Sequence, residues 1–260
     1  MAASTLIDRA LSEAQRVDGY WVLTDPTPHR AWAAMQWRRR ARENRLYSDP
    51  IALRLPEIQR DHPLAREWGE RADTLSRLAT HLSRLWRSLT ILDVGCGCGW
   101  LSHQLAAIRS NVRVFGLDLD PRELKLASRV FLHQRRVRFL CADALTVALP
   151  HGCVDVVVLA ATLDQVADPA ALLARAVDWL APDGELHIVD SAFANAGDRP
   201  PSTGALNPDL LAPYRTEVLY DPKAWRNRLA AWWWGEIPRT RHPWIKITRP
   251  DSLSTRRSPA

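Results

Sequence analysis

One glycine-rich turn constrains the fold of this chain more than any other stretch. Leu89–Val94 is an apolar, strand-like run, and glycines follow it at positions 95, 97 and 99. A helix-compatible segment then begins at Leu101. A strand, a glycine turn and a helix form a unit that binds nucleotide-like ligands, because glycine lets the backbone approach the ligand and the helix N-terminus attracts an anion. The sequence therefore predicts a ligand site at this turn.

Strand-like and helix-like segments alternate beyond the glycine turn. We expect strands at residues 112–117, 137–141, 154–160 and 185–190, and helices at 121–132 and 169–180. The run VDVVVLA at 154–160 is apolar apart from Asp155, which is typical of a strand buried on both faces. Such alternation predicts an α/β fold of the Rossmann-like, doubly wound type, with a mostly parallel sheet and helices on both faces.

The flanks of this core divide the chain further. Helical patterns at residues 1–20, 30–45 and 70–87 predict an N-terminal helical extension. We therefore expect a cap segment at 1–87, a ligand-binding core at 88–191 and a flexible tail at 251–260. Residues 192–250 should complete the fold and the acceptor site with a loop, a helix at 222–234 and a closing strand at 242–248.

Composition excludes several classes of protein. No apolar run is long enough to span a bilayer, and the first residues do not resemble a secretory signal, so we expect a cytoplasmic protein. The four cysteines lack zinc-site spacing and are predicted to be free thiols, with no metal bound. The net charge of +6 comes from the flanks, and only 3 of the 35 basic residues are lysine. This arginine excess does not by itself indicate nucleic-acid binding.

Three carboxylates follow successive strands, where open α/β sheets bind ligands. Asp93 precedes the glycines, and Asp118 comes about twenty residues beyond them and can accept hydrogen bonds from both hydroxyls of a ribose. Asp143 follows the third strand and can accept from an adenine amino group. A nicotinamide dinucleotide is an alternative ligand, but Trp100 stands where the motif that binds it has its third glycine. The spacing therefore favours a smaller ligand that ends in a carboxylate.

Five motifs carry a resemblance to a known family. ILDVGCGCGW, VFGLDLDP, CADAL, LPHGCVDVVVLAATLDQVADP and LAPDGELHIVD, in this order, resemble the class I S-adenosylmethionine-dependent methyltransferases, and most closely those that act on small molecules. The resemblance implies that S-adenosyl-L-methionine contacts the core at Asp93, Gly95, Cys96, Gly97, Asp118, Leu119, Ala142, Asp143, Ala144 and Ala160. Among these, the glycine turn would face the methionine part, Asp118 the ribose and Asp143 the adenine.

A second similarity lies upstream. ARENRLYSDPIALRL at 41–55 and GERADTLSRL further on resemble the entry segment of leucine carboxyl and polyketide O-methyltransferases. That resemblance implies that Arg71 meets the cofactor carboxylate, and it favours oxygen as the accepting atom.

The acceptor side carries candidates of a different kind. Asp164 follows the fourth strand and is the candidate catalytic base, with a cap or loop carboxylate as the alternative; Gln165 stands beside it, where the family often has histidines. Aromatic side chains of the flanks, Tyr20, Trp21 and Trp37 among them, are expected to line the acceptor pocket. Packing of the flanking helices, or peripheral contact with lipid headgroups, are alternative roles for these aromatics.

The sequence thus predicts methyl transfer to a small-molecule acceptor, with O-methylation of an aromatic or carboxylated compound preferred. Two alternatives stay open. One is an RNA or protein methyltransferase that uses the basic flanks, although nucleic acid is the less favoured partner. The other is a noncatalytic protein that binds the cofactor. The sequence does not specify the oligomeric state.

Overall fold

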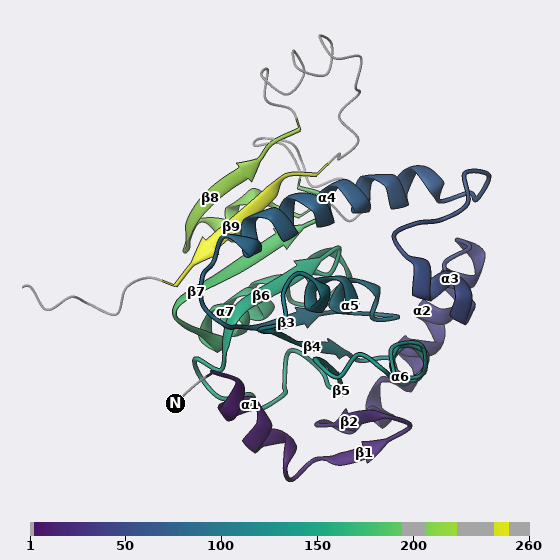
Figure 1. Cartoon of the computed structure of the whole chain (residues 1–260), viewed down its shortest axis with the longest axis horizontal. Coiled ribbons are helices and arrows are strands. Elements are labelled where there is room, and N and C mark those ends of the chain that lie inside the picture. Colours follow the sequence, from purple (N-terminus) through teal and green to yellow (C-terminus); the bar gives the residue numbers. More distant parts are fainter. Residues whose placement is uncertain (1–2, 194–205, 223–241, 250–260) are drawn as a thin grey trace, which may run out of the picture.

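The computed structural model describes residues 3–193, 206–222 and 242–249 (Figure 1). In this part of the chain one sheet of nine strands runs in the order β1-β2-β5-β4-β3-β6-β7-β9-β8. Its parallel centre consists of β5 (Val137–Cys141), β4 (Val112–Asp118), β3 (Leu89–Val94), β6 (Val154–Ala160) and β7 (Leu180–Val189). At one edge β2 (Tyr20–Val22) pairs parallel with β5, and β1 (Gln15–Val17) pairs antiparallel with β2. At the other edge β9 (Trp244–Thr248) and β8 (Arg215–Tyr220) are antiparallel. The predicted mostly parallel α/β sheet is confirmed.

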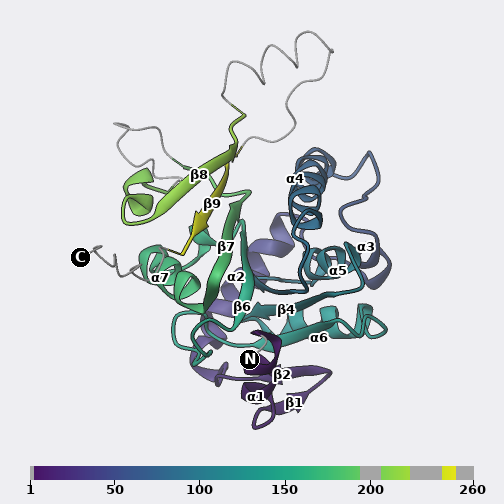
Figure 2. The same ribbon diagram turned by 60° about the vertical axis from the view of Figure 1, so that its left-hand side comes forward.

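Helices cover both faces of this sheet (Figure 2). On one face α1 (Ala3–Leu11) and α7 (Pro169–Trp179) pack on the buried side chains of Leu92, Val94 and their neighbours. On the other face α4 (Ala65–Ser83), α5 (Trp100–Ala107) and α6 (Pro121–Val130) pack on residues such as Ile91 and Val114. Alternate residues of β3 therefore enter opposite cores, which explains why its apolar run is continuous.

Further helices connect the N-terminal segment to the core. They are η1 (Thr27–His29), α2 (Arg30–Arg42) and α3 (Asp49–Arg54). Two further short helices are η2 (Leu163–Gln165), which follows β6, and η3 (Pro208–Leu211), which lies near the C-terminal strands.

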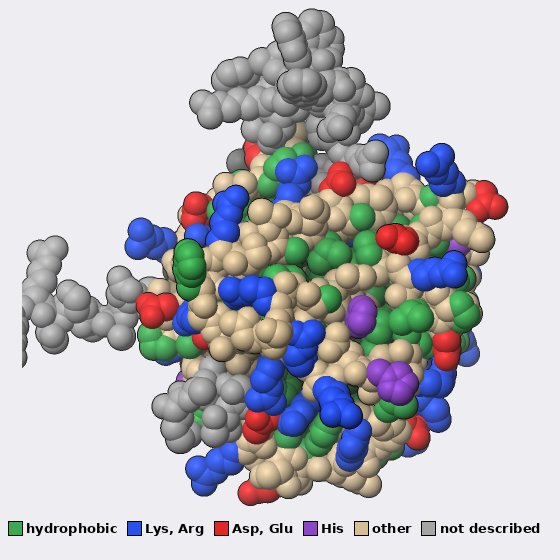
Figure 3. Space-filling view, viewed as in Figure 1, with side chains coloured by type: hydrophobic (Ala, Val, Ile, Leu, Met, Phe, Trp, Pro, Cys, Tyr) green, Lys and Arg blue, Asp and Glu red, His purple; other side chains and the backbone are tan. Residues whose placement is uncertain are grey.

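Basic and acidic side chains are interspersed over the face in Figure 3. Within the described residues, no helix combines the length and the apolar character that crossing a bilayer requires.

The strand order places a binding crevice beside β3. The chain leaves β3 for β4 and β5 on one side, then returns to β6 and β7 on the other. Val94 is paired with Leu117 of β4 and with Leu159 of β6, so the carboxyl ends of all three strands meet. Open α/β sheets bind ligands at such a switch point. The glycine turn begins there.

The prediction of a helix over residues 1–20 was wrong beyond Leu11, because residues 15–22 form the β1–β2 hairpin. Asp18 and Gly19 connect the two strands with φ of 48° and 95°, the left-handed pair that a tight hairpin turn requires. The Asp-Gly dipeptide between β-branched and aromatic residues was a hairpin signal in the sequence. β8 was also not predicted as a strand. The predicted helix at 222–234 and the tail at 251–260 lie outside the described residues except at position 222.

Candidate active site

Two adjoining cavities open at the carboxyl ends of the parallel strands. The larger has a volume of about 510 Å³ and the smaller about 250 Å³. Four residues line both cavities: Arg40, Gly95, Ala161 and Gln165. The cavities therefore adjoin as a narrow half and a wide half of the candidate site, and the glycine turn lies at their junction.

Hydrogen bonds to β4 fix the glycine turn. The backbone N–H groups of Gly95 and Cys96 donate to the carbonyl of Leu117 at 2.7 and 3.1 Å. The N–H of Gly97 donates to Oδ2 of Asp118 at 2.8 Å. The turn thus lies flat on the end of β4, and the cavity side of Gly97 is open because the glycine carries no side chain.

Asp118 is buried at the junction of the turn and the smaller cavity. Its second oxygen, Oδ1, accepts from the N–H of Asp120 at 2.9 Å. Burial raises the pKa of Asp118, while the nearby Arg40 guanidinium and these backbone N–H groups oppose that shift. Each carboxylate oxygen has a second lone pair, so Asp118 can still accept hydrogen bonds from a ligand in the cavity.

The smaller cavity gathers the residues that the sequence places around an adenosine. Asp118 and Leu119 after β4 line it together with the residues after β5, which are Ala142, Asp143, Ala144 and Leu145. Oδ1 of Asp143 accepts from the N–H of Leu145 at 2.9 Å, and Nε2 of His29 lies 3.6 Å from Oδ2. Trp32 of α2 closes the same cavity. The lining of this cavity is mostly apolar and includes the carboxylates of Asp118 and Asp143, which suits a base and a ribose.

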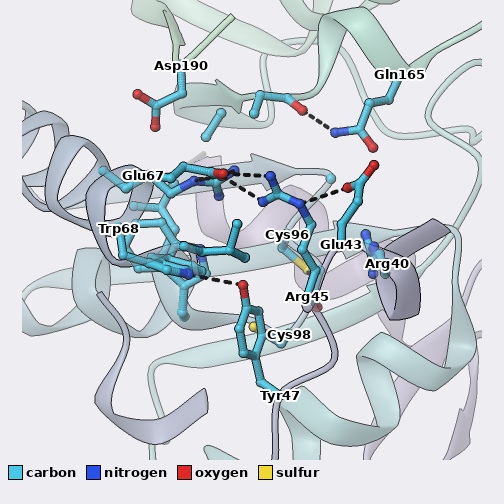
Figure 4. Close-up of a pocket in the computed structure, with 18 of the residues that line it drawn as sticks. Arg40, Glu43, Arg45, Tyr47, Glu67, Trp68, Cys96, Cys98, Gln165 and Asp190 are labelled. Carbon is cyan, nitrogen blue, oxygen red and sulfur yellow. Dashed lines mark hydrogen bonds and ion pairs between the residues drawn. The ribbon is translucent and has the colours of Figure 1, made fainter. Parts of the chain in front are cut away.

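One wall of the larger cavity consists of ion-paired side chains. Glu43 forms ion pairs with Arg39 at 3.1 Å and with Arg45 at 2.9 Å. Glu67 forms ion pairs with Arg45 at 2.6 Å and with Arg71 at 3.0 Å. Figure 4 shows Glu67, Arg45 and Glu43 in a row across the cavity. The core contributes Asp93, Gly95, Cys96, Gly97 and Ala160 to the same cavity. Arg71, predicted to meet the cofactor carboxylate, therefore lines the site but is already bound to Glu67.

Arg40 is a site residue that sequence reasoning missed. Its Nη1 lies 2.5 Å from Oε1 of Glu123, and a Cβ added to Gly97 would lie 3.9 Å from its Nη2. The guanidinium therefore lies over the glycine turn, where a ligand's carboxylate would also bind. The sequence shows only a run of three arginines at 38–40, and nothing in that run distinguishes the one that meets Glu123.

Two aspartates border the larger cavity where the sequence predicts the acceptor to bind. Asp164 of η2 follows β6, and Asp190 follows β7, and both line the larger cavity. Asp190 has a left-handed φ of 54°, and its Oδ1 accepts from the hydroxyl of Thr74 at 2.8 Å. Burial raises the pKa of both carboxyl groups. Asp190 was not predicted, although it ends a strand in the same way as Asp93, Asp118 and Asp143.

Gln165 and His242 complete that side. The side-chain amide of Gln165 donates to the carbonyl of Ala161 at 2.5 Å, and Ala161 has a left-handed φ of 52°. His242 lines the larger cavity and was missed by the sequence. Asp164, Gln165, Asp190 and His242 therefore surround the wide end of the site. Backbone strain at Ala161 and Asp190, each following a strand, is typical of functional sites.

The three aromatic residues predicted to line the acceptor pocket lie elsewhere. Tyr20 and Trp21 belong to β2 at the edge of the sheet, where Tyr20 is buried beside α6 and the guanidinium of Arg16 stacks on Trp21. Trp37 lies under the guanidinium of Arg122. None of the three lines either cavity. Residues 225 and 232–234, the tryptophans of the C-terminal segment, are outside the described residues.

One histidine cluster has the residue types of a metal site: His81, Glu185 and His187. The N–H of Trp244 donates to Nδ1 of His187 at 3.1 Å, so the proton of the neutral ring is on Nε2, beside Glu185 at 3.2 Å. A histidine that binds metal through Nε2 donates a proton from its other nitrogen, which Trp244 prevents here. The cluster is a partly buried polar network between α4, β7 and β9.

Comparison with known proteins agrees with this geometry. Residues 92–188 match a family model described as a methyltransferase domain. The core of the chain is a class I methyltransferase domain. The resemblance inferred from the five sequence motifs is thereby confirmed for the core, since the match spans strands β3 to β7 and the crevice that they form.

Curated relatives match about a hundred residues of this chain. An uncharacterized methyltransferase of Mycobacterium tuberculosis is 36% identical over 99 residues, which cover 38% of this chain and 49% of that protein. A ubiquinone biosynthesis O-methyltransferase of Cupriavidus pinatubonensis is 32% identical over 101 residues, 38% of this chain and 39% of that protein. The chain thus spans half or less of the length of these relatives.

Solved structures show the same fold over a larger part of the chain. A SAM-dependent methyltransferase from Aquifex aeolicus has a TM-score of 0.50 at 17% identity, covering 72% of this chain and 96% of that one. The [4+2]-cyclase SpnF has a TM-score of 0.50 at 25% identity, covering 59% of this chain and 60% of its own. The methyltransferase architecture therefore extends beyond the residues that the family model matches.

Proposed function

We propose that this chain transfers a methyl group from S-adenosyl-L-methionine to a small acceptor bound in the larger cavity. The observation that carries the proposal is the adjacency of the two cavities on either side of the glycine turn. A donor extended over the turn would place its adenosine in the narrow half and its reactive end at the mouth of the wide half.

The residues of the narrow half fit such a donor. Asp118 keeps lone pairs for the ribose hydroxyls, and the slot between Leu119 and Ala142–Leu145 accepts a flat base. The open face of Gly97 leaves room for the methionine part, because a Cβ there would point toward Glu123 and Arg40. Arg40 or Arg71 would then face the donor's carboxylate. Their ion pairs with Glu123 and Glu67 hold both guanidinium groups in place.

Methyl transfer needs alignment more than covalent help from the protein. When bound, the donor supplies a methyl group already activated by its sulfonium. The chain's own residues must position the acceptor in line with that methyl and exclude water. For an oxygen acceptor, the hydroxyl proton must also leave, and Asp164 lies on the correct side of the site to accept it. The similarity to O-methyltransferases over about 100 residues supports oxygen as the accepting atom.

Calorimetry with S-adenosyl-L-homocysteine, the demethylated product, tests the donor site. Asp118→Ala should weaken binding by about tenfold or more, because a carboxylate that accepts two hydroxyl donors is removed. Asp61→Ala, which removes a carboxylate from the turn before α4, is the matched control and should bind as the wild type does. Circular dichroism of both variants separates lost binding from lost folding, because Asp118 also supports the glycine turn.

Turnover tests the reaction itself. The wild-type chain, with methyl-labelled S-adenosyl-L-methionine and a small-metabolite extract, should release labelled product that is soluble and of low molecular mass. Strong cofactor binding with no labelled product would instead favour a noncatalytic binding protein. Label recovered only in RNA or protein would favour a macromolecular acceptor. Absence of binding of both the donor and its product would refute the proposal.

A further inference from the structure

Three loops at the amino ends of β3, β4 and β5 form a face that the candidate active site does not use. They are residues 84–88 after α4, 108–111 after α5 and 131–136 after α6, and each loop leads into one of these strands. The three strands are neighbours in the sheet, so the loops lie side by side. Both cavities open at the carboxyl ends of the parallel strands. This amino-end face therefore lies at the opposite edge of the sheet.

The amino-end face is strongly basic. Its loops contain no aspartate or glutamate, and they carry five arginines: Arg84, Arg87, Arg109, Arg135 and Arg136. Arg87 lies 3.1 Å from Asp155. The other four have no ion-pair partner within 4.0 Å among the residues that the structure describes. Four positive charges are therefore gathered here without a carboxylate to compensate them.

Hydrogen bonds between the loops hold the face together. Nη2 of Arg109 donates to the carbonyl of Arg87 at 3.2 Å, and Nη1 of Arg136 donates to the carbonyl of Arg109. The N–H of Leu89 donates to the carbonyl of Asn111 at 3.1 Å. A neutral carbonyl does not cancel the charge of a guanidinium. These contacts therefore fix the loops and leave the face positive.

Two apolar side chains stand out from the same loops. Trp86 is 97% exposed and Leu132 is 65% exposed. Leu82 and Leu89, on either side of Trp86 in the sequence, are buried in the core, so packing does not account for the tryptophan. Tryptophan is favoured at the interface between a bilayer and water, and nearby basic residues attract anionic lipids. The amino-end face combines both features.

We propose that the amino-end face binds the surface of an anionic phospholipid bilayer. Trp86 and Leu132 enter the headgroup region, while the exposed guanidinium groups of Arg84 and Arg135 meet lipid phosphates. A nucleic acid is also anionic and could stack a base on Trp86, but it offers no apolar environment to Leu132. The observations therefore favour the bilayer. The inference does not rest on the proposed function, because the face is remote from both cavities.

Co-sedimentation of the full chain with vesicles tests this inference. Vesicles of phosphatidylcholine and phosphatidylglycerol in equal parts are compared with vesicles of phosphatidylcholine alone, at physiological salt. We expect the chain to bind the anionic vesicles at least tenfold more tightly. Replacing Arg84 and Arg135 together with glutamine should weaken that binding about twentyfold, because each basic residue near an anionic surface contributes about fivefold. Trp86→Ala should weaken it about tenfold, because a large apolar side chain no longer enters the bilayer.

The matched control replaces Arg38 and Arg42 together with glutamine. Both are exposed residues of α2, whose other side chains line the cavities at the opposite edge of the sheet, so the loss of charge is the same. This variant should bind the anionic vesicles as the wild type does. The inference would be overturned by equal binding to both kinds of vesicle, by binding to neither, or by an equal loss in the control. Binding of a single-stranded RNA oligonucleotide that depends on Trp86, with no vesicle binding, would assign the face to nucleic acid instead.

Discussion

Replacing Gly99 with alanine should destabilise the protein by about 2 to 5 kcal/mol. Gly99 caps α5 at a φ of 78°, where an L-residue costs about 1 to 2 kcal/mol. The new Cβ would lie 2.6 Å from Cζ of Phe139 and 2.9 Å from Cβ of Ala127. Both neighbours are buried, so relieving the overlap should cost about 1 to 3 kcal/mol more. Urea denaturation followed by circular dichroism measures the change in the free energy of unfolding.

Two other glycines calibrate that estimate. Gly97→Ala has the same backbone problem, with a φ of 52°, but its Cβ would find its first neighbour at 3.6 Å. It should lose only about 1 to 2 kcal/mol, while weakening cofactor binding, because the methyl group enters the site. Gly69→Ala lies inside α4 with nothing within 4 Å and should stabilise the protein by up to about 1 kcal/mol. Equal stability of Gly99→Ala and Gly97→Ala would refute the packing argument.

Three further variants test electrostatics and capping. Burial raises the pKa of Asp93 to about 7, so the folded state keeps the carboxyl proton to a higher pH than the unfolded chain does. The free energy of unfolding should therefore fall as the pH rises from about 4 to 7, and Asp93→Asn should flatten that part of its pH dependence. Contact with His187 and His81 holds the pKa of Glu185 far below its usual range, although burial opposes this shift. Stability should therefore fall as the pH drops below about 4.5, and it should fall less steeply in Glu185→Gln. Asp168 accepts from the N–H of Ala171 at 2.9 Å at the start of α7, so Asp168→Ala should cost about 1 kcal/mol in thermal or urea unfolding.

The core strands could be predicted because their signals are local. Residues 137–141 and 154–160 are apolar runs flanked by turns, and they form β5 and β6 with those bounds. The β1–β2 hairpin was missed because its strands have three residues each, too few to show an alternating pattern. Its stability comes from pairing with β5, with Trp21 opposite Leu140, a contact between residues far apart in the chain. Only the Asp-Gly turn signalled it, and the helical pattern before it outweighed that signal.

The candidate site also contains residues that the sequence predicts and residues that it does not. The residues predicted around the donor line the two cavities, because the ends of parallel strands meet at one edge of the sheet. Asp190 also follows a parallel strand, β7, so the same rule could have identified it from the sequence. Arg40 could not have been found, because its position depends on α2 crossing the glycine turn and meeting Glu123. Trp37, three residues before it, lies instead beneath Arg122.

Helix α4 connects the wall of the acceptor cavity to the sheet at two separate points. Thr74 bonds to Asp190 at 2.8 Å, and His81, two turns further along the helix, bonds to Glu185 at 2.8 Å. Both partners belong to β7 or follow it directly, so the helix lies along that strand and its first turns carry Glu67 and Arg71 to the cavity. The proposed donor half of the site depends mostly on residues within the methyltransferase core. The acceptor half depends on how α4 is fixed to β7, which explains why the core motifs predict the donor and not the acceptor.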